Sequence, residues 1–349
     1  MPRFKPEELR NVNERLLSAS GIPQADAQLV ARLLVKAQLR GYSGHGVTRV
    51  VQYLSWIRKG NINLRDKPQV VRDGKVTALI EGNHYIGQVV AHEGMRLAIK
   101  KAKEHGVGVV CLRHAGHVGR LADYMEMAAE QGLIGMGAVC VGSGNTTLHG
   151  GMEGVIGTNP MAFGIPARNG KHILLDFATA AMSMSELQKR AARKEPIPAG
   201  VMLDGYGNPT TDFKTFRGPP RGVLLPFGGY KGSGLSLLTE ILGGILSANG
   251  LSSQWRDKGG AAVNGVFLQA IAVEEFQPMD QFLDNVDEFV SLIKSTKCAP
   301  GHKEIFLPGE MGRRREAKQL KEGVEVDAAT WTQLKELATE LEIELPHPV

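Results

Sequence analysis

Two histidine-containing segments carry the side chains in this sequence that are best suited to proton transfer. In the first, Tyr42-Ser43-Gly44-His45-Gly46-Val47-Thr48-Arg49, a glycine on each side of His45 lets the backbone bend and leaves the imidazole accessible. An imidazole can exchange a proton with a carbonyl or a hydroxyl near neutral pH. Arg49 follows about one helical turn later, so its guanidinium can face the same side and hold a carboxylate. A capping or packing histidine in a turn between two helices is the alternative.

The second segment is Arg113-His114-Ala115-Gly116-His117-Val118-Gly119-Arg120, between an expected strand and an expected helix. A glycine-rich loop that enters a helix presents free N–H groups, which attract an anionic phosphate or carboxylate. Metal binding is the rival interpretation. His114 and His117 have no carboxylate triad beside them, and Cys111, Cys140 and Cys298 form no CxxC pair, so we predict no metal site.

Two further segments combine glycine with polar residues. The first is Gly157-Thr158-Asn159-Pro160, followed by residues 174–180; turn chemistry and a strand end are the simpler explanation. In the second, Pro226–Gly234, four glycines surround Lys231 at the start of an expected helix. This arrangement favours an anion cradle, with an exposed lysine in an entry loop as the alternative. No strict GxGxxG, Walker A or GxSxG motif occurs, so a Rossmann domain, a P-loop nucleotidase and an α/β-hydrolase lack their usual support.

The composition restricts the class of protein. The 349 residues include 42% hydrophobic and 22% charged residues, which excludes a disordered or fibrous chain. The net charge is +5, and the basic run at Arg313–Arg315 lies beside Glu316, which favours a solvated helix face over nucleic-acid binding. We find no apolar signal core and no apolar stretch long enough to cross a membrane. We therefore expect a cytoplasmic protein with no nucleic-acid or membrane partner.

Hydrophobic periodicity and turn residues predict alternating strands and helices, which is typical of an α/β architecture. Asp73-Gly74 predicts a hairpin turn between the first two strands. The remaining glycine-rich region, 150–176, suggests short strands. We expect helices over 22–40, 47–58, 88–105, 121–131, 235–249, 280–295 and 328–341, and strands over 69–72, 78–81, 107–112, 133–141 and, as one or two strands, 261–274.

Taken together and in order, these segments resemble the malate/L-lactate dehydrogenase-like family of NAD(P)-dependent oxidoreductases. This is the non-Rossmann family that includes ureidoglycolate, sulfolactate and diketogulonate reductases and the cyclic-imine carboxylate reductases. The resemblance spans essentially the whole chain. The matching stretches are RGYSGHGVTR (40–49), RHAGHVG (113–119), GTNPMAFGIP (157–166), LLDFATA (174–180), IPAGVMLDGYGNPTTD (197–212), PFGGYKGSGLSLLTEILGG (226–244) and LPGE (307–310).

The resemblance implies a fold, an oligomeric state and a cofactor, NAD or NADP. The implied fold is a largely antiparallel mixed sheet flanked by helices, with a helical domain formed by both termini. Residues 1–70 with 310–349 would form the helical substrate and dimerisation domain, and residues 71–309 the NAD(P)-binding α/β domain of a homodimer.

The resemblance also assigns roles to individual residues. His45 matches the proton-donating histidine of the family, His117 a proton acceptor in some members, and Arg49 the neighbouring arginine. We expect the substrate to be bound by Ser43, Arg49, Thr158 and Asn159. We expect the cofactor to be bound by Ser143, Asp176, Phe177, Ala178, Thr179, Tyr230, Lys231, Gly309 and Glu310.

This sequence departs from the family at two places that bear on the substrate. Where the family commonly has Asp-Ser-His-Gly, the chain reads Ser43-Gly44-His45-Gly46, and the cofactor loop reads Val141-Gly142-Ser143-Gly144-Asn145. The predicted activity is the interconversion of a small 2-hydroxy acid and a 2-oxo acid, with His45 ranked before His117 as the acid/base group. The alternatives are reduction of a cyclic imine carboxylate and, from another class, a catalytically idle ligand-binding or scaffold protein.

Overall fold

The computed structural model describes residues 1–258 and 260–348. At its centre lies a seven-stranded mixed sheet in the order β2-β3-β4-β11-β5-β6-β7. Only the β3–β4 pair is parallel, so the expected largely antiparallel sheet is confirmed. Its strands are β2 (Gln69–Asp73), β3 (Thr77–Glu81), β4 (Val107–Ala115), β5 (Leu133–Val141), β6 (Met161–Ile165), β7 (Ile173–Phe177) and β11 (Asn264–Ala272).

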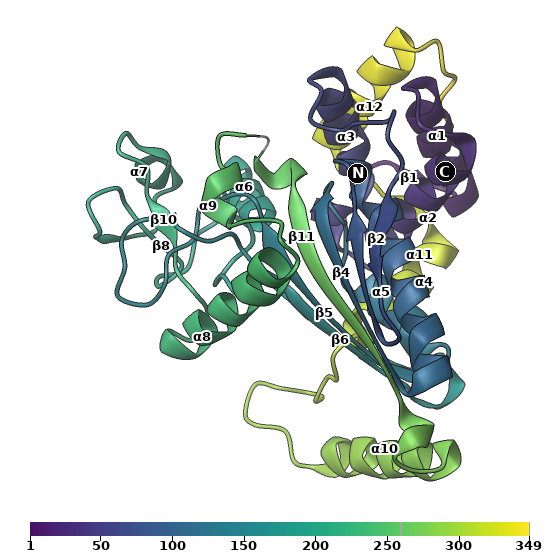
Figure 1. The fold of residues 1–349 in the computed structure, drawn as a ribbon. Helices are drawn as coiled ribbons and strands as arrows, with labels where there is room; N and C mark the ends of the chain where they lie inside the picture. Colours follow the sequence, from purple (N-terminus) through teal and green to yellow (C-terminus); the bar gives the residue numbers. More distant parts are fainter. Residues whose placement is uncertain (259, 349) are drawn as a thin grey trace.

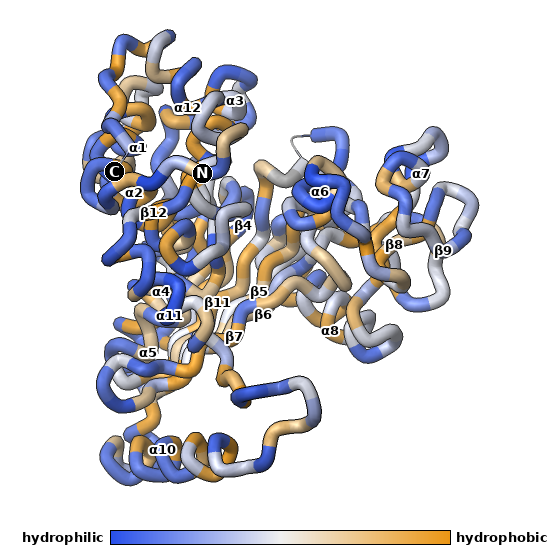
Figure 2. Tube along the Cα trace, turned by 180° about the vertical axis from the view of Figure 1, so that it is seen from behind, coloured by the Kyte–Doolittle hydropathy of each residue, from blue (hydrophilic) through white to orange (hydrophobic). Residues whose placement is uncertain are grey.

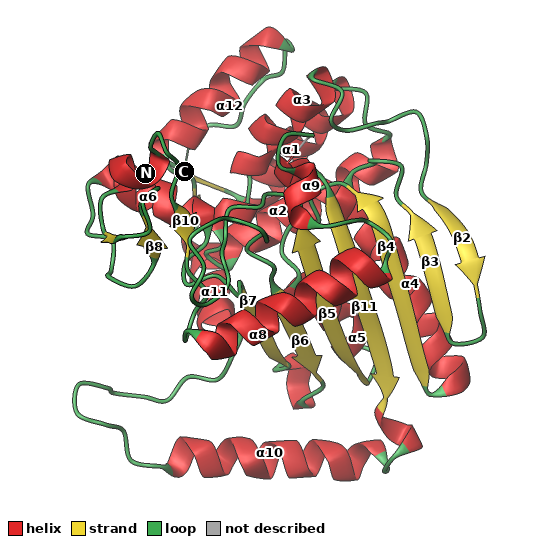
Figure 3. Cartoon of the chain, turned by 60° about the vertical axis from the view of Figure 1, so that its left-hand side comes forward, coloured by secondary structure: helices red, strands yellow, loops and turns green. Residues whose placement is uncertain are grey.

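Helices cover both faces of this sheet (Figures 1 and 3). On one face, α4 (Gly87–His105) packs on β4 and β11, and α5 (Ala122–Ala129) packs on β5 and β6. On the other face, α8 (Tyr230–Thr239) continues into a π-helical segment, η3 (Glu240–Leu246), that packs on β5 and β11. The strands between these layers are therefore rich in small and branched apolar residues, as expected of a sheet buried on both sides.

The two ends of the chain pack together at one end of the sheet. Strands β1 (Arg3–Phe4) and β12 (Val324–Glu325) pair antiparallel, and α2 contacts α11 while α3 contacts α12 (Figure 1). The predicted division into residues 1–70 with 310–349 and residues 71–309 stays a proposal. The terminal helices are α1 (Pro6–Ala19), α2 (Gln24–Leu39), α3 (Thr48–Arg58), α11 (Glu310–Glu322) and α12 (Ala328–Glu340), with the short 3-10 turn η1 (Ser43–His45) between α2 and α3.

A smaller lobe projects from the sheet and has its own apolar cluster around Leu187, Met202 and Leu224 (Figures 1 and 2). The cluster anchors α6 through Leu187, the one fully buried side chain of that helix. This lobe contains α6 (Met184–Arg193), β8 (Met202–Leu203), β9 (Pro209–Thr210), α7 (Phe213–Arg217) and β10 (Val223–Leu224). The remaining elements are η2 (Arg168–Gly170), α9 (Ser252–Trp255), η4 (Gly260–Ala262), η5 (Val273–Glu275) and α10 (Met279–Ser295).

Most predicted elements are confirmed, and the differences have local causes. The helix expected over 235–249 begins at Tyr230, inside the glycine-rich segment Pro226–Gly234 that we placed before it. Residues 261–274 contain one strand, β11, preceded by a 3-10 turn. The Asp73-Gly74 hairpin is present, but it is longer than a two-residue turn, since the N–H of Gly74 donates to the carbonyl of Thr77.

Candidate active site

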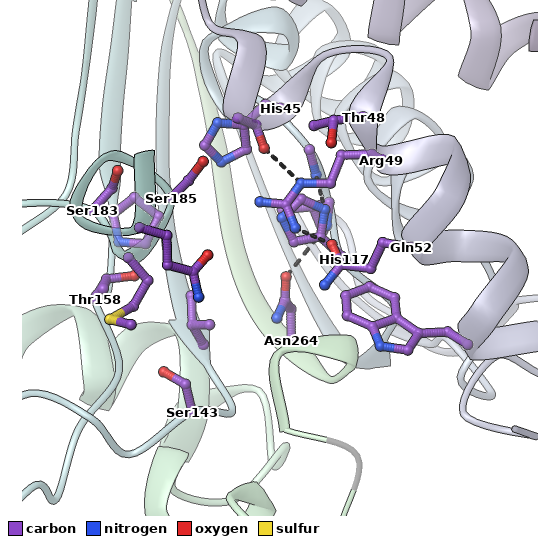
Figure 4. A pocket seen from close by; sticks show the side chains of 18 of the residues that line it. His45, Thr48, Arg49, Gln52, His117, Ser143, Thr158, Ser183, Ser185 and Asn264 are labelled. Atoms are coloured by element: carbon purple, nitrogen blue, oxygen red, sulfur yellow. Dashed lines mark hydrogen bonds between the residues drawn. The ribbon is translucent and has the colours of Figure 1, made fainter. Parts of the chain in front are cut away.

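The candidate site is a cavity of about 710 Å³ where the terminal helices, the sheet and the small lobe meet. It brings together three segments that are far apart in the sequence and that we singled out independently: His45 and Arg49, His117, and Thr158 (Figure 4). Its wall includes the cations Arg49 and Lys59 and, among the described residues, no aspartate or glutamate. A cavity with this lining is suited to an anionic ligand.

His117 is held by its loop and by one tyrosine. The loop after β4 lies so close to the start of α4 that a side chain at Gly87 would overlap the carbonyl of Gly116, which explains both glycines. The hydroxyl of Tyr53 lies 2.9 Å from His117 Nδ1, and the backbone N–H of Gly119 also points to this atom, at 3.3 Å. Because the Gly119 N–H can only donate, Nδ1 is an acceptor and the neutral ring carries its proton on Nε2.

His45 lies in the turn η1, directly before α3. Its ring is stacked on that of His117, with centroids 5.7 Å apart and planes 12° from parallel. Burial, together with the charges of Arg49, Arg120 and Lys189, lowers the pKa of His45 to about 3. Burial, Arg49 and His45 likewise lower the pKa of His117. Both imidazoles are therefore neutral near pH 7.

Arg49 presents its guanidinium to the same cavity. Its Nε donates to the carbonyl of Gly44 at 2.6 Å, and its Nη1 donates to Gln52. These two bonds orient the planar group, yet no carboxylate of the described residues lies within ion-pair distance of it. Burial of the unpaired cation lowers the pKa of Arg49. A buried cation of this kind is stabilised when a ligand supplies the missing carboxylate.

The other predicted substrate residues are divided between two cavities and the core. Thr158 lines the main cavity. Ser43 lies on the opposite side of the His45 turn, in a second cavity of about 1010 Å³, where its hydroxyl accepts from Lys189 Nζ at 2.5 Å. Asn159 is fully buried behind the wall, where it accepts from the N–H of Val141 and donates to Glu240 at 2.6 Å. Its geometry is that of a structural anchor for the end of β5.

Of the predicted cofactor residues, Ser143 lines the main cavity. The segment at the end of β7 lies outside it: the carboxylate of Asp176 accepts from the N–H of Ala122, the Phe177 ring packs edge-on against Phe227, and the Thr179 hydroxyl donates to the carbonyl of Asn159. Ala178 connects these residues. Burial raises the pKa of Asp176 to about 6.

The last two predicted cofactor segments lie at different places on the surface. Tyr230 and Lys231 are exposed at the start of α8. Gly309 has φ +91° and packs against Leu174 of β7, while Glu310 forms an ion pair with Lys294 at 2.6 Å. The Gly309–Glu310 segment thus lies beside β7, the strand that contains Asp176. Lys231 belongs to α8, which lies near β5.

The three arginines of the basic run 313–315 each contact a different neighbour. Arg313 donates to the carbonyl of His172 at 2.6 Å, Arg314 pairs with Glu304, and Arg315 packs against Gly41.

In the described part of the chain, no group of three histidine, cysteine or acidic side chains is arranged to hold a metal ion. No helix within residues 1–258 and 260–348 has the length and apolar character needed to cross a membrane.

Sequence reasoning missed two groups of cavity residues. The first lies on the face of α3 that carries Arg49: Gln52 and Trp56 line the cavity, and the buried Tyr53 contacts His117. The three-to-four spacing from Arg49 could have revealed it. The second comprises Ser183, Ser185 and Gln188, which line the cavity from the start of α6. This short polar helix carries no motif that links it to His45.

Comparison with known proteins agrees with this fold. The malate/L-lactate dehydrogenase family matches residues 4–335. The chain is 38% identical, over 345 residues, to the malate/(S)-sulfolactate dehydrogenase of Methanothermus fervidus, covering 98% of this chain and 99% of that protein. It superposes on the structure of malate dehydrogenase from Pyrococcus horikoshii with a TM-score of 0.89, at 35% identity, covering 99% of this chain and 97% of that one. The delta1-piperideine-2-carboxylate reductase of Pseudomonas syringae superposes with a TM-score of 0.85 at 27% identity, over 97% of this chain and 100% of that one.

The fold and the shared sequence thus define an oxidoreductase of the hydroxy acid dehydrogenase class. The chain belongs to the malate/L-lactate dehydrogenase family, whose members depend on a nicotinamide cofactor.

Proposed function

We propose that this protein interconverts a small 2-hydroxy acid and the corresponding 2-oxo acid. The observation that carries the proposal is that two neutral, stacked histidines share one cavity with a guanidinium that has no carboxylate partner. Arg49 would bind the substrate carboxylate and place C2 and its oxygen near the imidazoles. This is the arrangement that proton exchange with a substrate hydroxyl requires.

His117 is the stronger candidate for the proton-exchanging group, which reverses the order that we expected from the sequence. Its Nδ1 is held by Tyr53, and burial raises the pKa of that tyrosine, so the phenol stays protonated and can donate. In the neutral ring, the Nε2–H would donate a hydrogen bond to the substrate carbonyl oxygen. To reduce the substrate, His117 would first take up a proton, which the substrate carboxylate favours; the imidazolium would then give its Nε2 proton to the carbonyl oxygen and return to the neutral ring. His45 stacks on this ring and stays neutral beside it, since two adjacent imidazolium charges would repel each other.

The chain's residues fit a nicotinamide dinucleotide, NAD or NADP. When bound, the nicotinamide would accept or deliver a hydride at C2 of the substrate. Ser143 and Thr158 offer hydrogen-bonding groups at the cavity wall. Directly before α8, Gly228 and Gly229 both have positive φ, a conformation that glycine adopts without strain. A side chain added at Gly228 or Gly234 would meet no atom within 4 Å, so this segment has room for an anionic diphosphate beside Lys231.

Reduction of a cyclic imine carboxylate is the second candidate. The similarity to a delta1-piperideine-2-carboxylate reductase supports it. Because Arg49 would bind the carboxylate in either case, the arginine does not discriminate between a carbonyl and an imine. A catalytically idle protein is the least supported alternative, since the histidines, Arg49 and the exposed Lys231 are all present.

A panel assay tests the proposed function. The purified protein is mixed with 2-oxo acids or cyclic imine carboxylates and with NADH or NADPH, and oxidation of the cofactor is followed together with product identity. Reduction of at least one 2-oxo acid, with one product formed per cofactor oxidised, is expected. Turnover of imines alone would favour the second candidate. Failure of both coenzymes to bind, measured by thermal shift, would favour the idle protein.

A second copy of the chain is the proposed partner. Helix α8 and the π-helical segment leave an apolar stripe exposed, formed by Leu237, Leu238, Ile241, Ile245 and Leu246. A continuous apolar surface of this kind is typical of an interface between subunits. Sedimentation of the purified protein at micromolar concentration should therefore give the mass of a homodimer.

A further inference from the structure

The helix α6 approaches the His45 turn at one point, Gly44. A Cβ added at Gly44 would lie 2.9 Å from Cβ of Ser185 and still closer to its hydroxyl, well inside van der Waals contact. Gly44 does not have a positive φ, so its backbone does not require glycine. The space that a side chain at position 44 would occupy is instead filled by Ser185.

Ser185 also faces the substrate cavity. It lines the same wall as His45 and Gln188, and in the view of Figure 4 its hydroxyl lies on the side of the His45 ring opposite to Arg49. The neighbouring polar groups of α6 are engaged: the Ser183 hydroxyl accepts from the N–H of Glu186, and Lys189 donates to Ser43. Among the described residues, the Ser185 hydroxyl has no hydrogen-bond partner.

Lys189 adds a positive charge close by, from the second cavity, which Ser185 also lines. It lies one helical turn after Ser185, and its Nζ would be 3.8 Å from a Cβ at Gly44. No carboxylate of the described residues lies within ion-pair distance of this ammonium, and its field reaches His45. A hydroxyl donor and an unpaired cation therefore meet beside His45, away from the guanidinium that would bind the C1 carboxylate.

We propose that Ser185 is a substrate-contacting, specificity-determining residue that binds the end of the substrate remote from Arg49, and that Gly44 is glycine because it admits this side chain. The inference rests on the proposed function and names its substrate class. The preferred 2-oxo acid carries an anionic hydrogen-bond acceptor at its far end, which Ser185 contacts and the charge of Lys189 attracts. The hydroxyl that the family commonly carries beside the histidine is thus supplied here from α6.

The test compares two 2-oxo acids that differ only at the far end: oxaloacetate, with a distal carboxylate, and pyruvate, with a methyl group. Ser185→Ala should lower kcat/KM for oxaloacetate about tenfold or more, because a hydrogen bond to a charged group is lost. It should change kcat/KM for pyruvate less than about threefold. Ser291→Ala, on the remote helix α10, serves as the matched control. Equal losses for both acids, or no loss for either, would overturn the inference.

A residue swap tests the packing of Gly44 against Ser185. Gly44→Ser alone should impair turnover of both acids, because the new side chain overlaps Ser185. Adding Ser185→Gly should restore turnover and the preference for oxaloacetate, since the hydroxyl then comes from position 44. A double variant no more active than Gly44→Ser would contradict the inference, and thermal unfolding shows whether each variant folds. If the wild-type protein reduces neither acid nor any other 2-oxo acid, the proposed function itself fails, whereas an unchanged preference in active Ser185→Ala rejects only the role of Ser185.

Discussion

The imidazole rings of His45 and His117 stack nearly parallel, with their centroids 5.7 Å apart, although one comes from a turn between terminal helices and the other from a loop at the end of the sheet. The two rings cannot both be charged at this separation without strong repulsion, and burial disfavours the charge on either. Both imidazoles are therefore neutral in the protein without bound substrate. An incoming carboxylate on Arg49 would favour a proton on one of them.

Replacement of Arg49 tests the carboxylate clamp. Arg49→Met should raise KM for a 2-oxo acid about 100-fold or more, because the charged hydrogen bonds to the carboxylate are lost. Arg49→Lys should recover only part of this affinity, since a single ammonium does not reproduce the planar fork. Lys100→Met removes an exposed cation on α4, outside the cavity, and is the matched control. Steady-state kinetics decides, and a KM unchanged in Arg49→Met would show that the carboxylate binds elsewhere.

Removal of the Tyr53 hydroxyl tests how His117 is held. Tyr53→Phe should lower kcat about 10-fold to 100-fold, because Nδ1 of His117 loses the donor that fixes the proton on Nε2. The dissociation constant of the cofactor should not change. A positioning role also predicts an altered pH profile of kcat, which a merely structural role would not produce. The exposed Tyr206 offers the control, Tyr206→Phe.

The low pKa of His45 predicts a pH dependence of stability. Its pKa is about 3 in the folded protein and 6.5 in an unfolded chain. As the pH falls below about 6.5, the unfolded state takes up a proton that the folded state refuses, so stability is lost progressively toward pH 3. His45→Asn should flatten this loss by up to about 1.4 kcal/mol per pH unit. Denaturant unfolding at pH 7, 6 and 5 measures the slope, and parallel slopes for the two proteins would contradict the prediction.

Asp176 should show the opposite dependence. Burial raises its pKa from 3.8 to about 6, so its contribution to stability is fully present below pH 3.8 and is lost as the pH rises through 6. Asp176→Asn stays neutral, and its amide oxygen can still accept from the N–H of Ala122. The variant should be about 1–3 kcal/mol more stable than the wild type at pH 8 and equally stable near pH 4. A variant that is less stable at pH 8 would show that the carboxylate charge is needed there.

Local patterns predicted most elements of the sheet and of its covering helices, because strand and helix periodicities are recorded in neighbouring residues. The resemblance then identified His45, Arg49 and His117, which the structure brings into one cavity. The sequence did not reveal the contact between Gly44 and Ser185. That contact depends on how the small lobe packs against the terminal helices, and no local pattern in α6 encodes it.

Glycine-rich segments were harder to interpret than apolar ones. The segment Pro226–Gly234 was expected to precede the helix over 235–249, yet its residues from Tyr230 onward form the start of α8. Glycine tolerates both conformations, so the outcome is decided by tertiary packing. Asn159 shows the same limit for polar residues. The sequence is compatible with a substrate ligand at this position, but in the structure Asn159 is buried and hydrogen-bonded to Glu240.

We expect His117 to exchange a proton with a substrate bound through Arg49 while a nicotinamide cofactor exchanges the hydride. The most direct test is the single-turnover rate of 2-oxo acid reduction in His117→Gln, measured together with the dissociation constant of NADH or NADPH. The proposed chemistry predicts a rate lowered about 100-fold to 10,000-fold with cofactor affinity nearly unchanged. A normal rate in a folded His117→Gln protein would contradict it.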